Sequence, residues 1–179
     1  MLAKGSLYFF FMNSSYFQDY GEIDEFQTDI QRGHGVTILE ISPEIMVAIP
    51  MRSSLRPYMK NQRHLFPYKV YEKEDGNEAL KALDFSKLTI IDEKYIDKST
   101  TYFFQDDAER SYYLENFDRI STLIKNYINS YIRMCETIKK GEGISISYKK
   151  MFRYSTLRNF HEELGISISK EEIINCLNQ

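Results

Sequence analysis

Residues 36–49 read Val36-Thr37-Ile38-Leu39-Glu40-Ile41-Ser42-Pro43-Glu44-Ile45-Met46-Val47-Ala48-Ile49. Both apolar runs are rich in β-branched residues, which favour strands. The short polar segment between them predicts a turn, so the sequence indicates a β-hairpin built from residues 36–41 and 45–49. Pro50 follows at once. Because proline has no N–H to donate to a strand ladder, we expect the second strand to end there. Residues 52–67 are then expected to be irregular.

The rest of the first half predicts short elements around this hairpin. Continuous apolar runs predict buried strands, and an Asn or Ser before a short amphipathic run predicts a helix start. The expected elements are strands at residues 7–12, 66–70 and 88–91, a short helix at 14–20 begun by Asn13 or Ser14, and a helical turn at 77–83.

The second half predicts helices. Apolar residues recur at helical spacing from Asp106 to Lys139, which predicts one long helix or two, ended by Gly141 and Gly143. A further helix is expected from Ser155 or Thr156 to Gly165, and residues 169–172 form a capping box that opens a last helix. The sequence therefore predicts a single α+β domain spanning residues 1–179. Its expected core is a compact antiparallel β-sheet or β-barrel packed by C-terminal helices.

The charge distribution indicates an anion-binding surface on a chain whose net charge is −3. Residues 45–71 contain no Asp or Glu but five cations, and residues 139–158 contain six cations against one acid. Residues 72–120 carry 13 acids against 7 cations, so the acidic groups concentrate elsewhere. Two basic segments on an acidic background indicate a bounded anion-binding surface. The alternative is that these runs are simply solvated surfaces.

Several classes of protein are disfavoured by what the sequence lacks. It has no glycine-rich phosphate loop, no His-Glu-x-x-His and no Gly-x-Ser-x-Gly. The histidines are dispersed, and the acids at residues 106–109 fit a helix N-terminus, so we expect no metal and no cofactor. Cys135 and Cys176 are far apart and are expected to be reduced thiols. The apolar run at residues 7–12 is too short for a membrane span, and we expect a cytoplasmic protein.

The segment after Pro50 carries the candidate chemistry. A buried strand gives way to a cation, two hydroxyls and a second cation: Arg52, Ser53, Ser54 and Arg56. Guanidinium groups bind phosphate oxygens bidentately, and hydroxyls can bond a phosphate or a ribose. From spacing alone, simple turn chemistry is the favoured interpretation of the two serines.

Four segments resemble, in order, motifs of the ToxN/AbiQ family of endoribonuclease toxins of type III toxin–antitoxin systems, especially its TenpN-like branch. The segments are Gln31-Arg32-Gly33-His34-Gly35-Val36 leading into the hairpin, Ile49-Pro50-Met51-Arg52-Ser53-Ser54, Leu83-Asp84-Phe85-Ser86-Lys87-Leu88, and Ser155-Thr156-Leu157-Arg158-Asn159-Phe160. With residues 7–17 the resemblance touches most of the chain. It implies a metal-independent endoribonuclease that is inhibited by a small repeat RNA antitoxin, which it also processes, and that acts in phage defence by abortive infection.

The reaction implied is attack of the RNA's own 2′-hydroxyl on the adjacent phosphate, which gives a 2′,3′-cyclic phosphate. The substrate implied is mRNA. Arg32, Arg52 and Arg56 are expected to stabilise the phosphorane, Ser53 to orient phosphate or ribose, and His34 or His64 to transfer protons. The residues expected to bind RNA are Ser54, Lys60, Arg63, His64, Lys69, Lys149, Lys150, Arg153 and Arg158. Two alternatives stay open: a non-catalytic RNA-binding module and a helical protein-interaction domain.

Overall fold

The predicted hairpin is the centre of a seven-stranded antiparallel sheet. The computed structural model describes residues 7–21, 35–42, 45–100 and 102–178. Its strands are ordered β4-β5-β3-β2-β1-β7, with β6 pairing β3 off this path. The strands are β1 (Tyr8–Met12), β2 (Gly35–Ser42), β3 (Ile45–Leu55), β4 (Leu65–Glu72), β5 (Glu78–Asp84), β6 (Thr89–Ile91) and β7 (Ile96–Asp97). The described strands form an open sheet with β4 and β7 at its ends, so the α+β class is confirmed in its sheet form and not as a closed barrel.

Strand β3 does not end at Pro50, contrary to the sequence prediction. Val36 of β2 lies opposite Pro50, and from Met51 onward β3 pairs with β5 instead, Met51 opposite Leu83. The missing N–H of proline therefore falls where β3 changes partners, and the strand tolerates it. The segment predicted to be irregular is strand to Leu55, then the 3-10 helix η1 (Pro57–Asn61), then β4.

Residues 78–84 form strand β5, so the helical turn predicted at 77–83 is wrong. This strand pairs with β4 from Glu72 opposite Glu78 to Leu65 opposite Asp84. Gly76 adopts a φ of +77° in the tight turn between the two strands, a conformation that favours glycine. Pairing with β4 and burial of Leu80 and Leu83 override the weak local preference.

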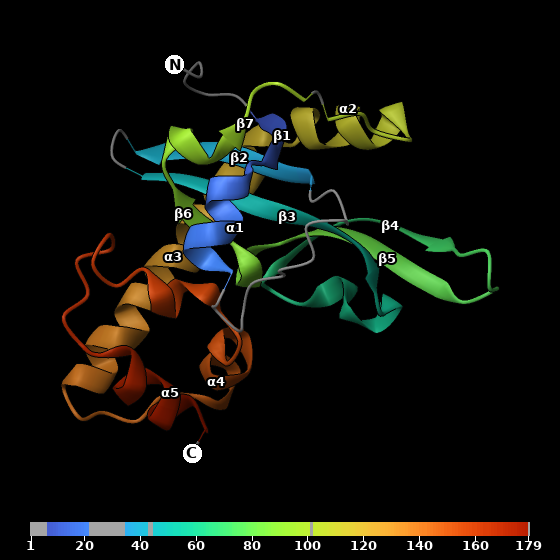
Figure 1. The fold of residues 1–179 in the computed structure, drawn as a ribbon. Helices are drawn as coiled ribbons and strands as arrows, with labels where there is room; N and C mark the ends of the chain where they lie inside the picture. The colour runs from blue at the N-terminus through green and yellow to red at the C-terminus, as the bar shows by residue number, and fades with distance from the viewer. Residues whose placement is uncertain (1–6, 22–34, 43–44, 101, 179) are drawn as a thin grey trace.

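The C-terminal helices gather below the sheet in Figure 1, whereas the helix Asp107–Glu115 lies near β1 at its upper side. The elements are α1 (Ser14–Tyr20), η2 (Phe85–Lys87), η3 (Glu93–Tyr95), α2 (Asp107–Glu115), α3 (Phe117–Lys139), α4 (Ile146–Phe152), η4 (Thr156–Asn159) and α5 (Lys170–Asn178). The predicted cap Asn13 accepts a hydrogen bond from the Tyr16 N–H at 3.2 Å, and the predicted capping box opens α5. The region from 106 to 139 is two helices, joined at Asn116.

The expected helix over 155–165 is wrong, because only the single 3-10 turn η4 forms there before further turns. The short helix α4 was not predicted. The core sits where α3 packs against the sheet, with fully buried Ile120, Ile124 and Tyr131 of α3 in the same cluster as Leu83 and Leu88. No helix in the described part of the chain is long and apolar enough to cross a membrane.

Candidate functional site

A nearly buried carboxylate organises the candidate site. Strand β5 ends at Asp84, which is 3% exposed. Its Oδ1 accepts hydrogen bonds from the Ser86 N–H at 3.0 Å and from the Ser86 hydroxyl at 2.6 Å, so it caps the 3-10 turn η2. A buried charge requires partners, and those partners come from three separate elements. We call this group the Asp84 cluster; its members are Arg52, His64, Asp84, Ser86 and Lys87.

Arg52 supplies the ion-pair partner of Asp84. Its Nη1 lies 3.1 Å from Asp84 Oδ2. Strands β3 and β5 bring the two together, since Arg52 lies opposite Ala82, two residues before Asp84. The arginine side chain is 39% exposed whereas the aspartate side chain is 4% exposed. The buried carboxylate thus fixes the position of the guanidinium, while part of the arginine side chain remains exposed to solvent.

His64 lies directly before β4, on the other side of Asp84. Its backbone carbonyl accepts a hydrogen bond from the Phe85 N–H at 2.8 Å, which ties it to the start of η2. Partial burial of the imidazole lowers the pKa of His64 below its ordinary 6.5; Asp84 opposes this shift and Lys87 adds to it. The ring is therefore uncharged at neutral pH, the form that accepts a proton.

Lys87 is the second cation of the cluster. Its Nζ donates a hydrogen bond to the carbonyl of Tyr154 at 3.0 Å. Burial lowers the pKa of Lys87 from its ordinary 10.5; Asp84 opposes the shift and Arg52 adds to it. Two cations therefore face one carboxylate beside a neutral imidazole. Such a site attracts an anion and holds a base next to it, which suits chemistry at a phosphate group.

A buried threonine fixes the turn that carries Lys87. The Thr156 hydroxyl contacts the carbonyls of Ser86, at 3.3 Å, and Leu88. Thr156 is fully buried, so without the hydroxyl these two carbonyls would be left with poorer partners. Element η4 thereby clamps both ends of the segment that holds Lys87.

We expect Thr156→Val, which keeps the shape and removes the hydroxyl, to lower the free energy of unfolding by about 1–3 kcal/mol. Urea denaturation measures this. Thr137→Val is the matched control, because the Thr137 hydroxyl also donates to a carbonyl, that of Arg133 at 2.9 Å, but in an exposed position. Equal losses in the two variants would contradict the proposed clamp.

Apart from Arg52 and His64, the predicted residues of the 52–69 segment divide into three groups. Ser53 and Ser54 are exposed at an irregularity of β3, and the Ser53 carbonyl accepts a hydrogen bond from the Tyr71 hydroxyl at 2.6 Å. A bulge of this kind re-aims neighbouring side chains and is frequent beside active sites. Lys69 instead forms an ion pair with Asp106 at the start of α2, so its charge is already engaged. Exposed cations around η1 complete the set: Arg56, Lys60 and Arg63.

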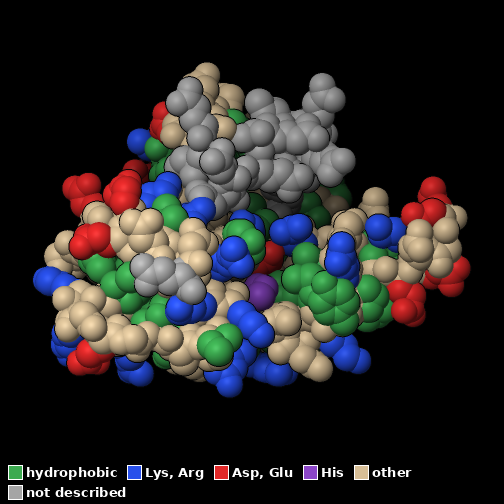
Figure 2. Space-filling view, turned by 90° about the horizontal axis from the view of Figure 1, so that it is seen from below, with side chains coloured by type: hydrophobic (Ala, Val, Ile, Leu, Met, Phe, Trp, Pro, Cys, Tyr) green, Lys and Arg blue, Asp and Glu red, His purple; other side chains and the backbone are tan. Residues whose placement is uncertain are grey.

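The second basic segment reaches the cluster through Tyr154. Lys149 and Lys150 lie on α4, and the guanidinium of Arg153 lies over the Tyr154 ring, 5.5 Å from its centre. Because Lys87 bonds the Tyr154 carbonyl, the end of α4 adjoins the cluster. Arg158 donates to the Arg153 carbonyl at 3.5 Å. Figure 2 shows Lys and Arg side chains gathered on this face around a histidine, between the C-terminal helices and the β4–β5 side. Predicted Arg32 and His34 lie outside the described residues.

Sequence reasoning named Arg52 and His64 but assigned no role to the residues that join them. Asp84, Ser86 and Lys87 lie in a segment that was singled out only for its resemblance to a family motif. One signal was available: an aspartate directly after an apolar strand, followed two residues later by serine, is a common cap for a turn. The charge partner of Asp84 could not be read from the sequence, because Arg52 is 32 residues away.

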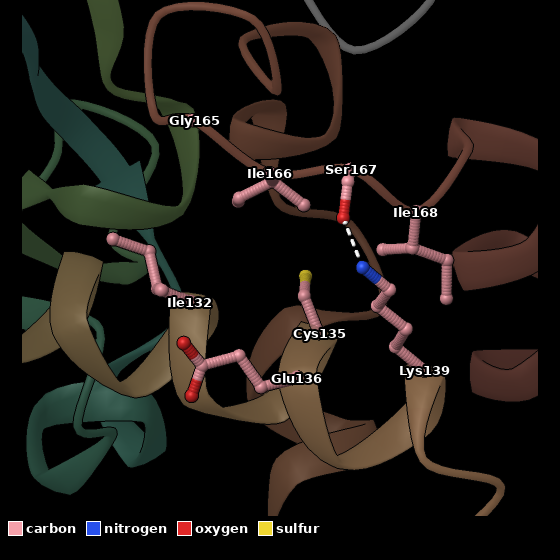
Figure 3. Close-up of a pocket in the computed structure, with 8 residues that line it drawn as sticks. All are labelled: Ile132, Cys135, Glu136, Lys139, Gly165, Ile166, Ser167 and Ile168. Atoms are coloured by element: carbon pink, nitrogen blue, oxygen red, sulfur yellow. Dashed lines mark hydrogen bonds between the residues drawn. The ribbon is translucent and has the colours of Figure 1, made fainter.

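The pocket of Figure 3 lies away from this cluster, between α3 and residues 165–168. Its volume is about 170 Å³, and Lys139 Nζ donates to the Ser167 hydroxyl across it at 2.7 Å. Isoleucines and Cys135 form much of the rest of the lining. Across the described ranges, His, Cys, Asp and Glu side chains nowhere group in threes or more in a way that could hold a metal ion.

Comparison of the chain with protein-family models, with curated proteins and with solved structures gives no match.

Proposed function

We propose that the protein is an endoribonuclease that cleaves RNA at the Asp84 cluster by attack of the ribose 2′-hydroxyl on the neighbouring phosphate. The observation that carries the proposal is the assembly around Asp84: Arg52 is ion-paired to it at 3.1 Å, and the partly buried His64 is tied to the start of η2, the turn that carries Lys87. RNA brings its own nucleophile, so the protein needs only a base, charge stabilisation and correct placement. The cluster offers the first two.

Each side chain has a role in this scheme. His64 takes the proton from the 2′-hydroxyl as the 2′-oxygen bonds to phosphorus, the P–O5′ bond breaks, and the departing 5′-oxygen takes up a proton from water. Arg52 and Lys87 stabilise the negative charge that develops on the phosphorane oxygens. Asp84 is a positioning residue, because it fixes the Arg52 guanidinium and the η2 turn. Ser53 and Arg56, exposed nearby on the chain, orient the phosphate or ribose. Arg32 and His34 keep their predicted supporting roles in this proposal.

A polymeric substrate fits the surroundings of the cluster better than a small phosphate ester. Figure 2 shows Lys and Arg side chains of the described residues spread around a histidine over one face of the molecule. Exposed cations extend from the cluster on both sides, around η1 and at the end of α4. A nucleic acid presents a row of phosphates that matches such a spread of charge.

The resemblance to the ToxN/AbiQ family supports the finer part of the proposal. The protein would act in the cytoplasm as a toxin on mRNA, without a metal, and would be held inactive by a small repeat RNA that it also processes. Its role would be phage defence by abortive infection. Growth measurements test this part: expression of the chain alone should arrest growth, and RNA from tandem repeats beside its gene should restore it. Rescue that requires translation of those repeats would contradict an RNA antitoxin.

RNA binding and RNA cleavage, measured together, separate the proposal from its two alternatives. The purified protein should bind RNA with an affinity that falls steeply with salt, and should cut it in the presence of EDTA. Salt-sensitive binding without cleavage by the wild type would favour the non-catalytic RNA-binding module. No binding at all would favour the protein-interaction domain. Cleavage that EDTA abolishes and Mg²⁺ restores would contradict the metal-independent mechanism.

A further inference from the structure

Two exposed tyrosines stand among the basic residues of the candidate site. Tyr58 on η1 is 69% exposed and Tyr154 is 62% exposed. Each is held by an arginine: Arg56 Nη1 donates to the Tyr58 hydroxyl at 3.3 Å, and Arg153 lies over the Tyr154 ring. Each ring is thus exposed beside a cation, and the arginine restrains the ring next to it.

The chain ties each tyrosine to a different side of the Asp84 cluster. Tyr58 lies in the connection from β3, which carries Arg52, to His64 directly before β4. The backbone carbonyl of Tyr154 accepts the hydrogen bond from Lys87 Nζ at 3.0 Å. One ring therefore belongs to the His64 side and the other to the Lys87 side.

We propose that Tyr58 and Tyr154 are stacking platforms for unpaired bases on the two sides of the phosphate that is cleaved. Every base presents a π-face, so stacking on tyrosine tolerates many sequences, while the neighbouring arginines meet the backbone phosphates. Bases inside a duplex are stacked on one another and are not free to stack on a protein ring. The substrate class is therefore single-stranded RNA. This inference rests on the proposed function, because it takes the Asp84 cluster as the cleavage site.

The test uses an RNA analogue that binds but cannot be cut, a single-stranded 2′-O-methyl oligonucleotide. A series of these oligonucleotides is made, each with 2-aminopurine at a different position. Binding to the wild type should quench the fluorescence at two groups of positions. Tyr58→Ala should abolish one group and Tyr154→Ala the other, each weakening binding by about 5- to 100-fold. The phenylalanine variants should retain both the quenching and most of the affinity.

Phe103→Ala is the matched control, because Phe103 is 81% exposed but lies in the segment that leads into α2. It should bind like the wild type. Wild-type affinity and quenching in both tyrosine-to-alanine variants would overturn the inference, as would equal binding of the duplex form. If the wild type cleaves RNA but both alanine variants leave the quenching unchanged, this inference alone is overturned. Failure of the wild type to bind the probe would overturn the proposed function as well.

Discussion

Replacement of His64 by alanine is expected to slow RNA cleavage by about 100- to 10,000-fold, the usual contribution of a general base or acid. Single-turnover cleavage of one RNA oligonucleotide measures this. The imidazole is only partly buried, and the structural hydrogen bond from Phe85 goes to the His64 backbone, so the variant should keep the wild-type melting temperature. Added free imidazole should restore part of the rate, which a purely structural role would not allow.

The pH profile gives His64 a second signature. The base works in its neutral form, and its pKa lies below the ordinary 6.5 because the ring is partly buried. The wild-type rate should therefore hold as the pH falls to 6.5 and decline only at lower pH, as the ring becomes protonated. This acid limb should disappear in His64→Ala.

His161 provides the contrasting variant. Its two ring nitrogens contact the Tyr131 hydroxyl and the Ile168 carbonyl, both at 2.8 Å, so it joins α3 to the 161–168 segment. We expect His161→Ala to lower the melting temperature and to leave the cleavage rate per folded molecule unchanged. An equal loss of cleavage in the two histidine variants, or full activity in His64→Ala, would contradict the assigned role.

Replacement of Lys87 by methionine, which keeps the length of the side chain and removes its charge, should slow cleavage by about 100-fold or more. Loss of one preorganised donor to the transition-state charge typically has an effect of this size. The same single-turnover assay measures it. Lys87→Arg should lose less, because it keeps the charge although not the geometry.

The pH dependence again identifies the group. Lys87 acts as a cation, and burial places its pKa below the ordinary 10.5. The wild-type rate should decline as the pH rises through this lowered pKa, and the alkaline limb should be lost in Lys87→Met. Lys81→Met is the matched control, since Lys81 is a half-buried lysine paired with Glu109 at 2.8 Å, outside the Asp84 cluster. It should lose stability but retain cleavage; an equal effect on cleavage would contradict a specific role for Lys87.

The part of the fold that the sequence predicted is the part determined by local patterns. The 36–49 hairpin has two β-rich runs and a short turn, and the capping box of α5 is complete within four residues. Strand β5 escaped prediction because residues 78–84 become a strand through pairing with β4. Helix α4 has only seven residues, and its buried Phe152 is the main link to the core. Such elements depend on tertiary packing.

The same distinction applies to the candidate site. The acid-free run after Pro50 pointed to Arg52, and the count of histidines included His64, so single residues were within reach of sequence reasoning. Their assembly was not, because it requires β3 to continue past Pro50 and pair with β5. Only that pairing brings Arg52 to Asp84. Lys69 was predicted to bind RNA because it lies in a basic run. The sequence could not show that it forms an ion pair with Asp106, which is distant along the chain.

The most direct test of the central claim is the chemical identity of the ends produced when the purified protein is incubated with RNA in EDTA. We predict new 2′,3′-cyclic phosphate and 5′-hydroxyl ends with the wild type, no cut where the nucleotide 5′ to the scissile phosphate is 2′-deoxy, and almost no product with His64→Ala. Cleavage at that 2′-deoxy position, 5′-phosphate ends, or the same products from His64→Ala would contradict the account.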